Sequence, residues 1–312
     1  MSASVGIARA GAATCAEELL RNADAAMYSA KTRGKGQYAM FETAMHAAVL
    51  ARLELEADLR RAVAGNEFRL RYQPIVDLRT GAMVGAEALV RWAHPERGLV
   101  PPAEFVPFAE ETGLIVPIGR WVLDEACRQG AEWQRDARGG VPLHITVNLS
   151  GRQLHEASLV ADVRQALASS GLPSESLVLE VTESVMMEHT SLTLARLHEL
   201  RALGVHLAVD DFGTGYSSLS YLHRFPVDTL KIDKTFVDAV GRGGDDPVLA
   251  RAIVALGGAL QLTTVAEGIE HPEQAAELAR LGCVLGQGYL WAPPLEAEAL
   301  SARLAAGPFA VG

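Results

Sequence analysis

The sequence is poor in cysteine, and it has no long apolar run and no excess of basic residues. Its three cysteines, Cys15, Cys127 and Cys283, lie far apart and form no C-x-x-C pair, which excludes the usual thiolate zinc sites. The apolar runs fall far short of the roughly 20 residues that a membrane-spanning helix needs. No part of this chain is therefore expected to contact a membrane.

The charge balance and the first residues exclude two further classes of protein. A formal net charge of −10 argues against binding of DNA or RNA polymers through a basic surface. It does not exclude a small anionic substrate, because metal ions held by carboxylates reverse the local field. Residues 1–5 lack the basic and apolar regions of a secretory signal. We expect a cytoplasmic location, although a full-length protein could carry upstream sensor or membrane segments.

The remaining composition is that of an ordinary globular protein, with 49% hydrophobic and 21% charged residues in a chain of 312. Residues 1–42 form a separate piece, too short for a domain of its own. It is predicted to contain a short strand at 4–8, a helix at 16–31 and a turn at 33–37. Residues 43–64 predict a connecting helix with an apolar stripe of Leu50, Leu53, Leu59 and Val63.

From residue 65 to residue 305, short strand-like runs alternate with helix-like segments. Eight such runs in alternating order are typical of a (β/α)8, or TIM, barrel of the α/β class. The predicted strands are 68–74, 84–90, 143–149, 177–181, 205–209, 229–232, 263–266 and 284–288.

Polar side chains lie in or directly after seven of these eight predicted strands. In a barrel of this class the C-terminal strand ends meet at one mouth, so residues far apart in sequence converge there. The residues are Glu87, Asn148, Glu180, Asp210, Asp211, Lys231, Glu267 and Gln287.

Five of these residues are carboxylates, which repel one another and raise each other's pKa values unless cations neutralise them. Their convergence implies metal. Carboxylate oxygens with the Asn148 carbonyl suit Mg²⁺ or Mn²⁺ and disfavour zinc. The adjacent Asp210 and Asp211 could reach two ions, as a two-metal activation of water opposite a phosphorus requires.

Each residue also has a structural explanation when it is considered alone. A single acid near a strand end is more often a helix N-cap or a surface ion pair. Asn148 could belong to a turn, and Lys231 could extend along a barrel wall to reach solvent. The run 210–218 carries two glycines among hydroxyl residues; it could be a loop that closes over substrate or a plain glycine-rich turn.

The signature Glu87-Ala-Leu-Val-Arg-Trp and seven other motifs resemble the EAL family of cyclic di-GMP phosphodiesterases. The resemblance covers about residues 65–300, with the motifs in the order of that family. The other motifs are Tyr72-Gln-Pro-Ile, Val147-Asn-Leu-Ser, Leu179-Glu-Val-Thr-Glu, Asp210-Asp-Phe-Gly-Thr-Gly-Tyr-Ser-Ser, Leu230-Lys-Ile-Asp, Val265-Ala-Glu-Gly-Ile-Glu and Gly286-Gln-Gly-Tyr.

The resemblance implies a role for each matched residue. The implied ligands of a first metal are Glu87, Asn148, Glu180 and Asp210, and Asp211 helps to hold a second. Glu267 and Lys231 would orient and deprotonate the attacking water, and the implied product is linear pGpG. The implied substrate-binding residues are Gln73, Arg91 and Gln287. Of these, Arg91 would contact a substrate phosphate and Gln287 would lie beside the scissile group. The implied anchors of the loop 212–218 are Glu183 and Glu270.

The same resemblance implies a modified barrel in which the first strand is antiparallel to the others, and a homodimer. The alternation of strands and helices alone predicts a regular barrel. Residues 1–42 resemble the C-terminal end of a GGDEF diguanylate cyclase domain whose signature is absent, so we expect no cyclase activity. Two rival functions remain: a catalytically silent EAL receptor for cyclic di-GMP, and a barrel enzyme that acts on another substrate with one Mg²⁺.

Overall fold

Contacts divide the chain into two units, Met1–Gly65 and Asn66–Gly312, in the computed structural model. The structure describes residues 3–10, 15–32, 36–136, 142–187, 191–213, 222, 224–240 and 248–309. Each unit is described by itself below.

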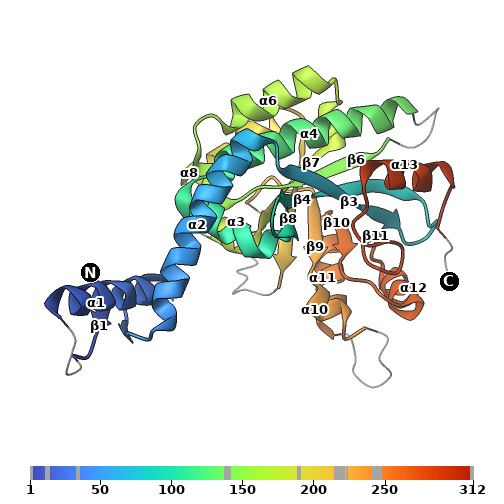
Figure 1. The fold of residues 1–312 in the computed structure, drawn as a ribbon. Coiled ribbons are helices and arrows are strands. Elements are labelled where there is room, and N and C mark those ends of the chain that lie inside the picture. Colours follow the sequence, from blue (N-terminus) through green and yellow to red (C-terminus); the bar gives the residue numbers. More distant parts are fainter. Residues whose placement is uncertain are drawn as a thin grey trace. The chain divides into compact units, whose positions relative to one another are not determined.

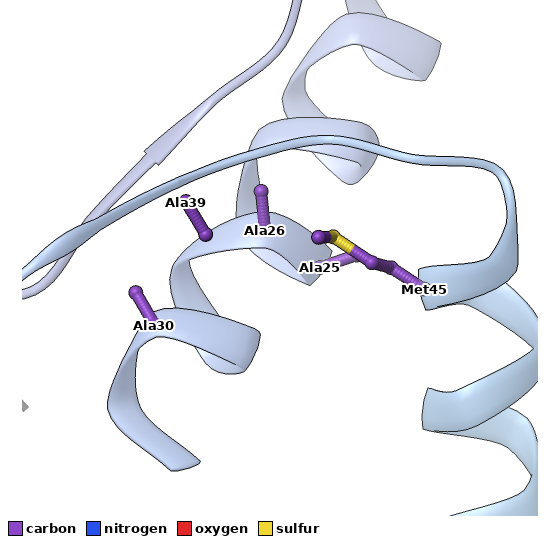
Figure 2. Close-up of a cluster of buried hydrophobic side chains, with 5 residues drawn as sticks. All are labelled: Ala25, Ala26, Ala30, Ala39 and Met45. Carbon is purple, nitrogen blue, oxygen red and sulfur yellow. The ribbon is translucent and has the colours of Figure 1, made fainter. Parts of the chain in front are cut away.

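The first unit pairs two short parallel strands, β1 (Val5–Ile7) and β2 (Tyr38–Met40), beside helix α1 (Ala16–Thr32). Helix α2 (Ala44–Gly65) follows. Small side chains allow these elements to approach closely, as Figure 2 shows for a buried cluster to which Met45 of α2 also belongs. The other members of this cluster are Ala25, Ala26, Ala30 and Ala39.

The predicted strand and helices of this unit are confirmed, whereas β2 was not predicted. Most of the predicted turn, residues 33–35, lies outside the described residues. The predicted apolar stripe of α2 is only partly correct. Leu59 is buried, but Leu53 and Val63 are exposed.

In the second unit, all eight predicted strands are present and close into a barrel, with helices around them (Figure 1). A further strand, β5 (Gly98–Val100), was not predicted and extends the sheet by pairing with the end of β4. The barrel strands are β3 (Phe68–Asp77), β4 (Met83–His94), β6 (His144–Asn148), β7 (Leu177–Thr182), β8 (His206–Phe212), β9 (Thr229–Ile232), β10 (Thr263–Ala266) and β11 (Leu285–Gly286).

The regular barrel that alternation predicts is wrong in one respect, because β3 runs antiparallel to both β4 and β11. The turn between β3 and β4 is too short for the crossover that parallel strands require. Asp77 accepts hydrogen bonds from the backbone N–H groups of Arg79 and Thr80, and Gly81 adopts a positive φ of 69°. The turn therefore forms a hairpin, and β3 closes the barrel between β4 and β11.

The longer helices of this unit bury apolar side chains at helical spacing, and some helices have recognisable caps. In α4, Ile118, Val122, Leu123 and Ala126 are buried and recur at helical spacing. Ser150 and Gln153 form a capping box at α5. Among the described residues, no helix is both long and apolar enough to cross a membrane. The helices are α3 (Pro102–Thr112), α4 (Ile115–Asp136), α5 (Gly151–His155), α6 (Leu159–Ser170), α7 (Glu183–Met187), α8 (Ser191–Arg201), α10 (Lys234–Val237), α11 (Val248–Ala259), α12 (Pro272–Leu281) and α13 (Ala297–Ala305).

Candidate metal centre and substrate site

Lys231 of β9 lies among four carboxylates that come from four other parts of the barrel. Its Nζ atom is 2.5 Å from Oε1 of Glu267 and 2.7 Å from Oε2 of Glu180. It is 3.4 Å from an oxygen of Glu87 and 3.4 Å from an oxygen of Asp210. The structure therefore brings these five predicted site residues together, and Lys231 does not extend to solvent, since its side chain is 1% exposed.

Burial and mutual charge set the protonation of this cluster. Burial raises the pKa of Glu180, and the neighbouring carboxylates add to this effect, while Lys231 opposes it. The pKa of Glu267 rises to about 7 for the same reasons. Burial also tends to raise the pKa of Glu87, but Lys231 and hydrogen bonds from Gln287 and Asn148 outweigh it and lower that pKa. The pKa of Lys231 is raised, because its carboxylates outweigh its burial, so the side chain is a permanent cation.

Three side-chain amides connect Glu87 to the rest of the site. Asn148 Nδ2 donates to Oε1 of Glu87 at 2.7 Å, and Gln287 Nε2 donates to its Oε2 at 2.8 Å. The same Gln287 amide donates to Oε1 of Gln73 at 3.0 Å. Gln287 Oε1 is buried without a hydrogen-bond partner. A buried acceptor left without a donor is costly, so this oxygen marks a place where a bound group would donate a hydrogen bond.

Asp210, Asp211 and Glu267 form the outer part of the site. One carboxylate oxygen from each lies within 4.8 Å of the others. Adjacent residues of a regular strand face opposite sides of a sheet. Here β8 is irregular, with a register shift between Val209 and Phe212 and a positive φ of 54° at Asp211. This irregularity allows both neighbouring aspartates to contribute to one cluster.

The residues present fit the divalent metal ions that the sequence predicts. All the candidate donors are carboxylate or amide oxygens, the ligands that Mg²⁺ and Mn²⁺ prefer. When Glu87, Glu180, Asp210, Asp211 and Glu267 are ionised, five negative charges face the single ammonium of Lys231. The remaining four negative charges equal the charge of two divalent cations.

The two predicted loop anchors, Glu183 and Glu270, contact residues near the barrel mouth. Glu183 Oε2 accepts a hydrogen bond from the backbone N–H of Gly213 at 2.8 Å. Glu270 Oε1 pairs with Nζ of Lys234 at 2.6 Å. Residues 214–218 of the predicted loop lie outside the described residues, so the anchoring roles of Glu183 and Glu270 stay predictions.

Arg91 lies on the same face of β4 as Glu87, four residues nearer the end of the strand. Its guanidinium donates to the backbone carbonyl of Val90 at 2.9 Å. Burial lowers the pKa of Arg91, and the positive charge of Arg71 adds to this effect. Tyr289 and Glu87 act in the opposite direction and raise that pKa. Arg71 was missed in the sequence, although it stands two residues before Gln73 and therefore shares its face of β3.

We expect Mn²⁺ or Mg²⁺ to raise the thermal midpoint of the barrel by roughly 5–10 °C when the free metal is about 100 times its Kd. The reason is that the ions bind a carboxylate cluster that only the folded chain assembles. Calorimetry or differential scanning fluorimetry in metal and in EDTA measures the shift. Asp211→Asn should shrink it, whereas an equal shift in this variant would contradict the metal site.

Without metal, the stability of the barrel is expected to fall as pH rises from 5 to 8. The folded-state pKa of Glu267 is about 7, above its ordinary value of 4.5, so the folded chain holds a proton that the unfolded chain has released. This stabilisation is complete below the unfolded pKa and is lost as pH rises through 7. The lowered pKa of Glu87 acts only below its ordinary value of 4.5 and does not oppose this trend. Chemical denaturation in EDTA should show a flatter profile for Glu267→Gln than for the wild type.

Comparison with known proteins points to one family. The family described as the EAL domain matches residues 56–294. MucR of Pseudomonas aeruginosa, described as a bifunctional diguanylate cyclase/cyclic di-GMP phosphodiesterase, is 48% identical over 98% of this chain and 44% of its own length. PdeR of Escherichia coli, described as a cyclic di-GMP phosphodiesterase, is 42% identical over 96% of this chain and 45% of its own. The chain thus spans less than half the length of these curated relatives.

Solved structures agree with this assignment. A structure described as the PaMucR phosphodiesterase in complex with c-di-GMP superposes with a TM-score of 0.75 at 48% identity, over 79% of this chain and 99% of that one. The EAL enzyme Bd1971, in a form bound to cAMP and cyclic di-GMP, superposes with a TM-score of 0.77 at 33% identity, over 82% of this chain and 70% of that one. The barrel with its antiparallel first strand and the match over residues 56–294 together show that this chain belongs to the EAL domain family.

Proposed function

We propose that this chain is a metal-dependent phosphodiesterase that hydrolyses cyclic di-GMP to linear pGpG. One observation carries the proposal: an EAL barrel holds Lys231 among four carboxylates, and two of these, Asp210 and Glu267, lie in an oxygen cluster with Asp211. No expected metal-ligand position has lost its oxygen donor. This favours an enzyme over a silent receptor and over a barrel enzyme with a single Mg²⁺.

We assign the metal ligands by side-chain chemistry and proximity. The proposed ligands of one ion are Glu87, Asn148, Glu180 and Asp210, and Asp211 with Asp210 would hold the second. Mg²⁺ and Mn²⁺ both suit this set, because both accept oxygen ligands. When bound, such ions neutralise a phosphodiester and supply a water molecule of lowered pKa.

The remaining residues orient the reactants. Glu267 is the proposed general base, because its carboxylate lies in the outer cluster with Asp210 and Asp211, where the metal-bound water would lie. Lys231 fixes this carboxylate at 2.5 Å. Gln73 and Gln287 are proposed to contact substrate, since the buried Gln287 Oε1 lacks a donor. Arg91 is proposed to bind a substrate phosphate.

The test is incubation of the purified chain with cyclic di-GMP and Mn²⁺ or Mg²⁺, followed by chromatography of the nucleotides. Metal-dependent appearance of pGpG, abolished by EDTA, is the expected result. Binding without product would favour the silent receptor. The absence of both binding and product would contradict the proposal.

We also propose that residues 1–42 are the C-terminal remnant of a GGDEF domain, that 43–64 connect it to the barrel, that 65–305 are the phosphodiesterase domain and that the chain forms a homodimer. The parallel β1 and β2 strands beside α1, and the single helix α2 that follows, support the first two assignments. Sedimentation equilibrium of the full chain tests the dimer.

A further inference from the structure

The paired strands β3 and β4 carry a row of side chains from the carboxylate cluster to the rim of the barrel. Gln73 lies opposite Glu87, Arg71 opposite Leu89, and Arg69 opposite Arg91. Directly opposed residues of an antiparallel pair share a face, and alternate residues on that face are about 6.6 Å apart along the strand. Since the Gln73 and Glu87 side chains are connected through Gln287, this face is the one that carries the site. Along this face the charge changes from acidic at the Gln73–Glu87 pair to basic at the Arg69–Arg91 pair, four residues away on each strand.

Arg71 is held in place on this face by Glu296. Leu295 and Tyr72 exchange backbone hydrogen bonds, which puts the next residue, Glu296, beside Arg71. Nη1 of Arg71 is 2.5 Å from Oε1 of Glu296, and the Arg71 side chain is only 25% exposed. A guanidinium has five N–H donors in a rigid fork. In the described part of the chain Glu296 is the one ion-pair partner of Arg71, so most of these donors are available to a ligand.

Arg71 belongs to a local excess of positive charge. Arg69 donates to the backbone carbonyls of Asn66 and Phe68, and Arg91 donates to that of Val90. Within the described residues neither arginine forms an ion pair. Like charges opposite one another on a strand pair are destabilising, and among the described residues only Arg71 of these three arginines pairs with a carboxylate, that of Glu296. In a chain with a net charge of −10, this arrangement favours a bound anion.

We propose that Arg71, positioned by Glu296, is a specificity residue that binds the phosphate of the cyclic dinucleotide that is not being hydrolysed. This inference rests on the proposed function. A cyclic dinucleotide carries two phosphodiesters in one ring, so when one lies at the carboxylate cluster the other must lie against a nearby part of the wall. Arg71 is one step from the Gln73–Glu87 pair towards the rim and offers the planar fork that matches phosphate oxygens.

Steady-state kinetics of Arg71→Met on two substrates tests this proposal. With cyclic di-GMP, KM should rise about 10- to 100-fold, as expected for a lost hydrogen bond to a charged group, while kcat changes little. With bis(p-nitrophenyl) phosphate, which carries a single phosphodiester, kcat/KM should change less than about twofold. Arg71→Lys should restore part of the affinity, because it keeps the charge but not the fork. Glu296→Gln should give a smaller rise in KM for cyclic di-GMP.

Arg280→Met is the matched control, since Arg280 is an exposed arginine of α12 that pairs only with Glu277 in the described structure. It should leave both activities unchanged. An unchanged KM for cyclic di-GMP in Arg71→Met would overturn the Arg71 assignment alone, and so would an equal loss on both substrates. Failure of the wild-type chain to bind or cleave cyclic di-GMP would instead overturn the proposed function, and the Arg71 assignment with it.

Discussion

Glu87→Gln is expected to abolish the metal-dependent hydrolysis of cyclic di-GMP, with a fall in kcat of about a thousandfold or more. A bound ion contributes several kcal/mol to stabilising the transition state, and each 1.36 kcal/mol corresponds to about tenfold in rate. Glu87 is buried and contacts Asn148, Gln287 and Lys231, so its carboxylate is already desolvated before a metal ion binds. Turnover at saturating Mn²⁺, with the metal-induced shift of the thermal midpoint, measures the effect.

The glutamine variant keeps the shape of the side chain, whereas Glu87→Ala should give the same loss of activity with an additional loss of stability. That loss arises because alanine leaves the two amide donors and Lys231 with a missing acceptor. Glu104→Gln is the control, because Glu104 is an exposed glutamate of α3 that pairs with Arg97. Wild-type turnover in a correctly folded Glu87→Gln protein would remove Glu87 from the metal centre.

The sequence predicts the barrel well because its strands are buried and short, with turns or helices between them. Each of the eight predicted strands is present, and most boundaries differ by one to four residues. The antiparallel β3 is invisible to periodicity, since residues alternate between two faces in either direction of the chain. The length of the connection between β3 and β4 carries that information, because only a hairpin fits it. The two unpredicted strands, β2 and β5, have three residues each and little alternation to detect.

The sequence predicts which residues form the candidate site, but it does not predict the contacts between their side chains. Strand ends locate Glu180, Asp210 and Glu267, yet sequence spacing cannot reveal that all three lie within 3.4 Å of the Lys231 ammonium. Such distances depend on the register between strands. The same holds for Arg71, whose partner Glu296 is far away in sequence and comes beside it only through the pairing of Tyr72 with Leu295.

Glu267→Ala is expected to lower kcat for cyclic di-GMP by about 10²- to 10⁴-fold, the usual contribution of a general base. Binding of the cyclic dinucleotide should be retained. The structural reason is that Glu267 lies at the outer edge of the carboxylate cluster, whereas Glu87, whose pKa is lowered, remains 3.4 Å from Lys231 and continues to neutralise it. Single-turnover kinetics and calorimetric titration of the nucleotide separate the chemical step from binding.

This prediction separates Glu267 from Glu87 although both carboxylates contact Lys231. Loss of a metal ligand should reduce the metal-induced thermal shift, whereas loss of the base should leave that shift largely intact. Glu273→Ala, an exposed acid in the first turn of α12, controls for a change in surface charge. Tight binding with unchanged turnover in Glu267→Ala would exclude Glu267 as the base. A lost thermal shift would instead make it a metal ligand, and water activation would then depend on other groups of the same cluster.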